Sequence, residues 1–239
     1  MGRYSTLLSP QLVDLAGVTW DHRVLDVGSG PGALTAELVA RVGPAAVSAV
    51  DPSESFVAAA TARNPGVSVQ QASAEQLPFP AESFDVALAQ LVVHFMSDPD
   101  RGLAEMRRVT RRGGVVAACV WDHGGGQGPL SPLWDAAREL EPEVEGEAHL
   151  AGSREGDLAG LFADVGLREI EETALYVSVE HPTFADWWEP YTFGVGTAGS
   201  YVAGLDPDHR ARLRERCLAA LGAGPFTLSA RAWTARGVV

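Results

Sequence analysis

The residues best suited to chemistry form a glycine-rich turn near the start of the chain and an acid beyond it. Residues 24–32 read VLDVGSGPG, and a second apolar run, 47–50, ends in Asp51. Glycine has no Cβ, so this turn can approach a ligand closely, and the helix that follows aims its N-terminus at that ligand. A carboxylate at the tip of the next strand can accept hydrogen bonds from both ribose hydroxyls. The pattern predicts a nucleoside site.

The spacing of the glycines and the acid before them distinguish between nucleoside ligands. A dinucleotide-binding turn has the pattern Gly-x-Gly-x-x-Gly, but here the third glycine comes one position early and Ala33 takes the later place. Asp26 precedes the turn, and its carboxylate would repel a pyrophosphate. S-adenosylmethionine carries an ammonium group and no phosphate, so it suits this turn better. The alternative is a glycine turn without a ligand.

The first half of the chain alternates apolar runs with helical patterns, which predicts a parallel sheet with helices on both faces. Leu34, Leu38 and Val42 indicate one helix, and Ser53 is predicted to cap a second that ends at Arg63. A third helix is predicted to end at Gly113-Gly114. The predicted strands are 23–27, 47–50, 67–70, 84–89 and 115–121.

The second half predicts more helices and two further strands. An apolar stripe beginning at Leu158 indicates a helix that Gly166 ends, and Asp206-Pro207 is typical of a helix start. Residues 167–179 and 226–233 are predicted strands, the latter antiparallel because its apolar residues alternate. We expect a single domain, 1–239, with lid segments at about 1–18, 122–152 and 181–221.

Four segments resemble class I S-adenosylmethionine-dependent methyltransferases of the small-molecule type, similar to the menaquinone/ubiquinone C-methyltransferases. They are VLDVGSGPG, AVDPS (49–53), ASAEQLPFPAESFDVA (72–87) and QLVVHFMSDP (90–99), and the resemblance covers about residues 20–120. It implies an α/β, Rossmann-like, doubly wound sheet of seven strands. The sheet would be mostly parallel with an antiparallel last strand, beside a partly helical lid.

The resemblance also implies which residues bind the cofactor. Asp26 would lie beneath the glycine turn, where it orders the turn's amides, reaches the amino group through water or merely caps the loop. Asp51 would bind the ribose. The turn (Gly28, Ser29, Gly30, Gly32) would lie beside the methionine part, with Pro52, Ser53, Ser73, Ala74 and Glu75 around the adenine and Gln90 and Leu91 beside the sulfonium. Ser73 stands where the family often has Asp, and Glu75 has the alternative of a solvated loop acid.

A catalytic base is needed only when the methyl acceptor keeps a proton at neutral pH. His94 follows the fourth strand and is the first candidate for this base, against the alternative of a packed or solvent-facing histidine. Asp122 and His123 follow the fifth strand, and their alternative is ordinary loop polarity. Seven aromatic residues are candidates for an acceptor pocket or for the lid's own core: Trp121, Trp134, Trp187, Trp188, Tyr191, Phe193 and Tyr201.

Composition excludes several classes of function. All 18 basic residues are arginine, which removes lysine Schiff-base chemistry and the P-loop. A net charge of −13 argues against nucleic acid as a substrate. Cys119 and Cys217 lack metal spacing, no apolar run is long enough for a membrane span, and no signal peptide is evident. We therefore expect a cytoplasmic monomer or homodimer without a metal.

The leading prediction is methyl transfer from S-adenosylmethionine to a small, apolar or aromatic metabolite by in-line displacement, leaving S-adenosylhomocysteine. Two other functions stay open. One is an S-adenosylmethionine-binding protein without catalysis, and the other is an NAD(P)-dependent oxidoreductase. The arginines near the third helix, Arg101, Arg107, Arg108, Arg111 and Arg112, are predicted to form a solvated face.

Overall fold

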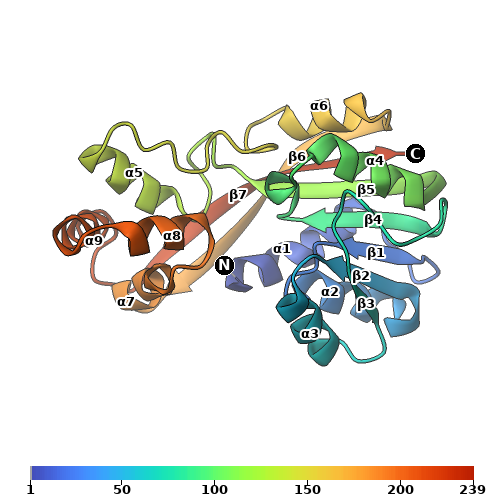
Figure 1. The fold of residues 1–239 in the computed structure, drawn as a ribbon, viewed down its shortest axis with the longest axis horizontal. Coiled ribbons are helices and arrows are strands. Elements are labelled where there is room, and N and C mark those ends of the chain that lie inside the picture. Colours follow the sequence, from blue (N-terminus) through green and yellow to red (C-terminus); the bar gives the residue numbers. More distant parts are fainter. Residues whose placement is uncertain (1) are drawn as a thin grey trace.

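The computed structural model describes residues 2–239 and contains one seven-stranded sheet (Figure 1). Its strand order is β3-β2-β1-β4-β5-β7-β6. Strands β1 to β5 pair in parallel, whereas β7 pairs antiparallel with both β5 and β6. The predicted doubly wound sheet with an antiparallel last strand is confirmed. The strands are β1 (Val24–Val27), β2 (Val47–Asp51), β3 (Ser68–Gln71), β4 (Phe84–Gln90), β5 (Thr110–Trp121), β6 (Arg168–His181) and β7 (Phe226–Val238).

Helices cover both faces of the sheet, because each face presents a separate apolar cluster. Leu8 and Leu12 of α1 and Leu34 and Leu38 of α2 belong to the cluster on one face. Helices α4 and α6 contribute to the cluster on the other face. The helices are α1 (Gly2–Leu15), α2 (Ala33–Val42), α3 (Glu54–Arg63), α4 (Pro99–Val109), α5 (Ser131–Leu140), α6 (Asp157–Asp164), α7 (Phe184–Trp188), α8 (Gly196–Gly204) and α9 (Pro207–Leu221), with 3₁₀ turns η1 (Pro44–Ala46), η2 (Val93–Phe95) and η3 (Glu189–Phe193).

Two local predictions are wrong. Helix α4 ends at Val109, and β5 already begins at Thr110, so Gly113-Gly114 lies inside a strand and does not end the helix. A Cβ on Gly114 would lie 2.5 Å from the carbonyl oxygen of Asp85, which explains the glycine by close strand contact. Ser53 precedes α3, but its side chain makes no capping bond and pairs with the Ser55 hydroxyl instead.

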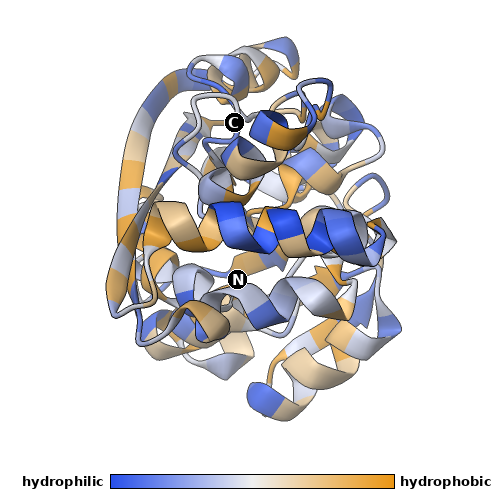
Figure 2. Ribbon diagram, turned by 90° about the vertical axis from the view of Figure 1, so that its left-hand side faces the viewer, coloured by the Kyte–Doolittle hydropathy of each residue, from blue (hydrophilic) through white to orange (hydrophobic). Residues whose placement is uncertain are grey.

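A separate helical unit lies where the paired strands β6 and β7 extend beyond the end of β5. Helices α7, α8 and α9 connect the two strands, and α5 packs against α9. Figure 2 looks onto this unit and shows mixed hydrophilic and hydrophobic residues along its front helix. The third apolar cluster contains Trp134, Trp187 and Trp188, with Tyr191 and Tyr201 packed against it. These five aromatics therefore form the core of the unit, whereas Phe193 is 74% exposed and Trp121 belongs to the sheet.

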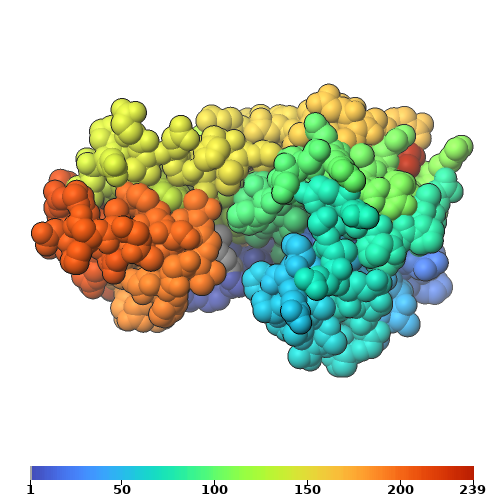
Figure 3. Space-filling model, in the orientation of Figure 1, coloured from blue at the N-terminus to red at the C-terminus, as the bar shows by residue number. Residues whose placement is uncertain are grey.

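The carboxyl ends of the parallel strands face the helical unit across a hollow. Figure 3 shows this hollow between the orange surface of the unit and the blue-to-cyan surface around α3. Loops at this edge of a parallel sheet are where ligands bind in open α/β folds. Within residues 2–239, no helix has the length and apolar character that a membrane crossing requires.

Candidate functional site

The glycine turn between β1 and α2 is fixed by backbone bonds to the neighbouring strand. The amides of Gly28 and Ser29 both donate to the carbonyl oxygen of Val50, at 2.8 and 2.9 Å. Gly28, Gly30 and Gly32 all have positive φ, at 72°, 52° and 81°. A Cβ on Gly28 would lie 2.5 Å from Val92, whereas a Cβ on Gly30 would meet no atom of residues 2–239 within 4 Å. The turn is therefore tightly packed at Gly28, whereas space is open beside Gly30.

Asp51, at the carboxyl end of β2, holds the turn from the side. Its Oδ2 accepts the Gly30 amide at 2.8 Å, and its Oδ1 accepts the Ser53 amide at 2.9 Å. The side chain is almost fully buried, with 5% of the residue exposed. Each carboxylate oxygen has a second lone pair, so the group can still accept two hydroxyl donors. That arrangement fits a ribose diol beside the glycine turn.

Asp26 lies beneath the turn and is completely buried. Its Oδ2 accepts the Thr35 hydroxyl at 2.6 Å, and its Oδ1 has no hydrogen-bond partner within the described chain. Burial raises the pKa of Asp26 to about 7, opposed by the Thr35 hydrogen bond and supported by the Asp51 charge. The prediction that Asp26 orders the amides of the turn is wrong, because Val50 and Asp51 accept from Gly28, Ser29 and Gly30. Because Oδ1 is unpartnered, it can still accept a hydrogen bond from the cofactor's amino group, as the other prediction requires.

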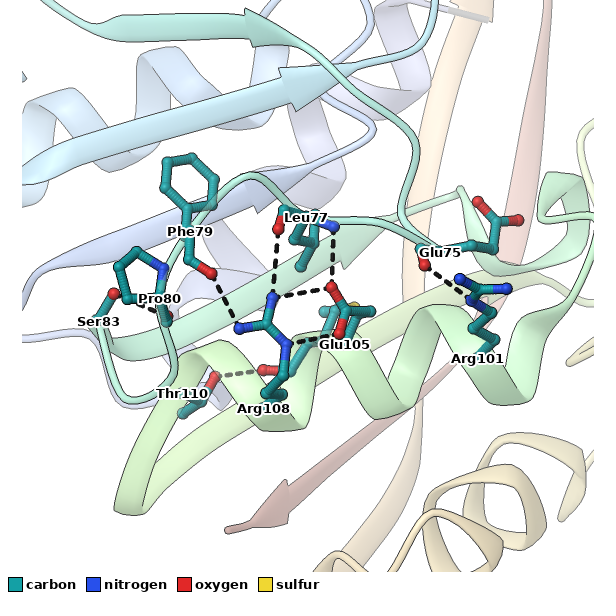
Figure 4. Close-up of polar contacts among 10 residues, drawn as sticks. Glu75, Leu77, Phe79, Pro80, Ser83, Arg101, Glu105, Arg108 and Thr110 are labelled. Carbon is teal, nitrogen blue, oxygen red and sulfur yellow. Dashed lines mark hydrogen bonds and ion pairs between the residues drawn. The ribbon is translucent and has the colours of Figure 1, made fainter.

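Helix α4 holds the loop before β4 that carries Glu75, Leu77 and Phe79 (Figure 4). Arg108 donates to the carbonyl oxygens of Phe79 and Leu77, and Glu105 accepts the Leu77 amide. Figure 4 also shows Arg101 donating to the Glu75 carbonyl oxygen, at 3.0 Å. Arg101 and Arg108 are therefore structural links, not part of a purely solvated face.

Glu75 joins the adenine-side loop to the loop after β4. Its Oε1 accepts the Ser97 amide at 2.8 Å. Burial would raise the pKa of Glu75, but backbone hydrogen bonds, including that from Ser97, outweigh it and lower the pKa. The Glu75 carboxylate is therefore already bonded within the fold, whichever of its two predicted roles applies. The neighbouring Ala74 is buried and apolar.

The end of β4 carries backbone strain, as functional sites often do. Leu91 adopts a φ of 62°, which is unusual for a bulky residue. Its amide donates to the carbonyl oxygen of Cys119 at 2.9 Å. The preceding Gln90 donates from Nε2 to the Ser5 carbonyl oxygen of α1, at 3.2 Å. Its Oε1 is buried and lacks a partner among residues 2–239. Helix α1 therefore reaches the edge where Gln90 and Leu91 are predicted to meet the sulfonium.

Two histidines from different strand ends come together beyond Gln90. His94 lies in η2 and His123 follows β5, and their ring centroids are 5.8 Å apart. Both are buried, at 6% and 7% exposure. Burial, with a smaller contribution from His123, lowers the pKa of His94 to about 3. His94 is therefore neutral at physiological pH and a weaker base than its place in the sequence predicts.

Asp122, the third candidate base, is used by the fold. Its carboxylate accepts from Arg231, from the Trp233 indole at 3.0 Å and from the Gly125 amide at 2.8 Å. It is 1% exposed. These three donors, one of them the arginine, already occupy the carboxylate. The suggestion that Asp122 acts as a base is not supported by this geometry.

Comparisons with known proteins find similar sequences. A methyltransferase domain model matches residues 25–118, which include the glycine turn, Asp51 and β4. An uncharacterized methyltransferase of Mycobacterium marinum is 36% identical over 175 residues, covering 69% of this chain and 68% of that protein.

The chain belongs to the S-adenosylmethionine-dependent methyltransferase family. A chloroplastic 2-methyl-6-phytyl-1,4-hydroquinone methyltransferase of rice is 36% identical over 118 residues, which are 48% of the chain described here. The chain spans only 32% of the rice enzyme's length. The solved YcgJ protein of Bacillus subtilis superimposes with a TM-score of 0.63 and 18% identity over 99% of this chain and 98% of its own, which shows a shared fold.

The structure brings most of the residues predicted to bind the cofactor to the carboxyl ends of the parallel strands. The glycine turn, Asp51 and Pro52-Ser53 are linked through Asp51, and Gln90-Leu91 end the adjacent strand β4. Glu147, which faces His123, is a site residue that sequence reasoning missed. It lies in an acidic loop with no periodicity, so no local signal separates it from its solvated neighbours.

The open position above Gly30 gives a prediction with a matched control. Gly30→Ala places a methyl group in the space proposed for the cofactor. Gly156→Ala places a methyl group before α6, at a left-handed φ of 86°, where no described atom lies within 4 Å. Both variants should lose about 1 kcal/mol of stability from the left-handed backbone. We expect only Gly30→Ala to lose affinity for S-adenosylhomocysteine, by tenfold or more in calorimetry. Equal affinities for the two variants would contradict the placement.

Proposed function

We propose that this protein transfers a methyl group from S-adenosylmethionine to a small, apolar or aromatic metabolite. The observation that carries the proposal is the open glycine turn, bound from the side by the buried carboxylate of Asp51. The unpartnered oxygens of Asp26, Ser29 and Gln90, each buried within the described residues, supply polar contacts that a cofactor's polar groups would satisfy. The residues present therefore fit the group that the family binds.

The protein would contribute to the reaction by aligning the cofactor with the acceptor and by excluding water. When bound, the cofactor supplies an electrophilic methyl group on a positively charged sulfur. Asp51 would hold the ribose and the turn would lie beside the methionine part, while Leu91 and Gln90 would lie at the strand end nearest the sulfur. Well-oriented reactants can gain roughly 7–11 kcal/mol from such placement.

The helical unit would act with α1 as a lid over the acceptor side, through the segments 1–18, 122–152 and 181–221. The exposed side chains of Phe95 and Phe193, at 64% and 74%, give apolar surface to an acceptor. Because most lid aromatics pack within the unit's own core, exposed apolar side chains support the proposed acceptor class better than those aromatics do. A net charge of −13 agrees with a small-molecule acceptor and no nucleic acid.

The two alternatives are separated by binding and transfer measured together. A nicotinamide oxidoreductase would place a diphosphate at the glycine turn, close to the carboxylate of Asp26, which is electrostatically unfavourable. S-adenosylhomocysteine at a hundred times its dissociation constant should raise the melting temperature by about 5–10 °C, and NADH should not. Transfer of a labelled methyl group to a metabolite extract would exclude a binding protein without catalysis. A shift with NADH alone would overturn the proposal.

A further inference from the structure

The histidine pair beyond β4 contains two buried nitrogens without a ligand. Nδ1 of His94 and Nε2 of His123 are both sealed from solvent and lack a hydrogen-bond partner in the part of the chain that the structure describes. Buried polar atoms are nearly always paired, so two such atoms on neighbouring rings indicate a protic group or a water that binds there. The pair lies next to Phe95, whose ring centroid is 3.9 Å from that of His94.

Only one of the two histidines has a carboxylate beside it. Oε2 of Glu147 lies 3.7 Å from Nδ1 of His123 and accepts the Trp134 indole N–H at 3.1 Å. Glu147 is 5% exposed, and Trp134 anchors it to the core of the helical unit. The distance of 3.7 Å is longer than a hydrogen bond, and such contacts tighten when the base is charged.

Among the groups near His123, the carboxylates are those that favour its protonated form. Burial lowers the pKa of His123, while the charges of Glu147 and Asp122 oppose that effect. Asp122 is already paired with Arg231, and the neighbouring His94 stays neutral. Burial raises the pKa of the Tyr191 phenol in η3, with a smaller contribution from the charge of Glu147, so Tyr191 also stays neutral. Glu147 is thus the carboxylate available to stabilise an imidazolium at His123.

We propose that His123 is the catalytic base of this methyltransferase, that Glu147 is its positioning residue, and that the acceptor is a neutral, apolar molecule carrying a hydroxyl group. The inference rests on the proposed function. It moves the base role from His94 to His123, because within residues 2–239 Glu147 pairs with His123 and no carboxylate pairs with His94. His94 would instead contact the acceptor as a neutral hydrogen-bonding group.

The step balances with the residues and cofactor already named. The acceptor oxygen forms a bond to the methyl carbon while the bond from sulfur to that carbon breaks, and its electron pair stays on sulfur. The hydroxyl proton passes to Nε2 of His123, and the resulting imidazolium faces Glu147. An anionic acceptor would need no base and would be repelled by Glu147, which is why a neutral hydroxyl is favoured.

The test compares initial rates of labelled methyl transfer to an apolar metabolite extract. His123→Gln should lower the rate at least a hundredfold, within the range that general bases contribute, and His94→Gln by tenfold or less. His149→Gln removes a histidine from an exposed histidine–glutamate pair in the same loop and should leave the rate unchanged. The labelled product should be an O-methyl compound by mass spectrometry.

The pH profile separates positioning from mere structural support. Neutral His123 is the active form, so the rate should rise with pH through its pKa and then level. Loss of the negative charge in Glu147→Gln lowers that pKa, so the rise should move to lower pH while the plateau falls, and Glu147→Asp should recover part of the plateau. A histidine NMR titration should show the same shift in the folded variant without turnover.

Three results would overturn the inference. They are a His123→Gln rate within threefold of the unmodified protein, a Glu147→Gln profile with an unchanged midpoint, and label found only on nitrogen. Failure of the proposed function looks different, since the unmodified protein would then bind S-adenosylhomocysteine and label no product. In that case the base assignment falls with it.

Discussion

Asp51→Ala is expected to weaken S-adenosylhomocysteine binding by about 10²–10⁴-fold while the protein stays folded. The variant removes the proposed acceptor for two ribose hydroxyls, and hydrogen bonds to a charged group are worth about 1.5–3 kcal/mol each. It also releases the Gly30 amide, which the Asp51 carboxylate holds at 2.8 Å. The affinity is measured by isothermal titration calorimetry, with the melting temperature of the free variant recorded beside it.

Asp85→Ala is the matched control for this experiment. Asp85 also holds a backbone amide, that of Arg23 at 2.7 Å, and it pairs with Arg111. It lies at the start of β4, on the opposite edge of the sheet from Asp51. The control should therefore lose stability without losing affinity. Equal loss of affinity in both variants would show that Asp51 acts only through the fold.

The parts of the site that could be predicted are those encoded by short spacing. The glycine turn and Asp51 each follow an apolar run, and the strand ends of a parallel sheet meet at one edge, so local pattern fixes their common place. The boundaries of β2 and α3 follow for the same reason, since Asp51 and Arg63 end the elements that the pattern predicts. Local chemistry and tertiary position agree at these residues.

The rest depends on contacts between residues far apart in the sequence. Asp122 finds Arg231 across 109 positions of chain, and no periodicity relates the two. Glu147 lies beside His123 in a loop without regular secondary structure, and the indole of Trp134 donates to its carboxylate. The aromatic residues of 181–204 follow no regular spacing, because they lie on short helices and a 3₁₀ turn whose core forms only when α5 and α9 pack against them.

The candidate bases illustrate how tertiary contacts change a chemical role. His94, Asp122 and His123 all follow strand ends at the same edge, so their sequence positions alone give no ranking. Burial without a carboxylate makes His94 a weak base, and Arg231 engages Asp122. Only His123 combines an unpartnered nitrogen, within the residues described, with a carboxylate neighbour. The ranking comes from side-chain partners that the sequence does not specify locally.

Asp122→Ala should destabilise the protein by about 3–5 kcal/mol, the cost of breaking a buried ion pair by removing one partner. The variant leaves the Trp233 indole and the Arg231 guanidinium without their acceptor. For a chain of this size, the melting temperature should fall by about 6–20 °C. Differential scanning calorimetry gives that shift, and S-adenosylhomocysteine affinity measured well below the transition should stay within threefold of the unmodified protein.

A double variant distinguishes this structural role from a catalytic one. Asp122→Ala with Arg231→Leu removes both charges, and apolar replacement of a buried pair is often neutral, so part of the lost stability should return. Asp135→Ala removes a carboxylate from an exposed pair with Arg138 and should change stability by less than 1 kcal/mol. If Asp122→Ala melted like the unmodified protein yet lost methyl transfer, Asp122 would act in the reaction after all. Loss of stability with partial recovery in the double variant would show that the Asp122 carboxylate links β5 to β7. Asp122 would then be a structural neighbour of the base His123 and not a base itself.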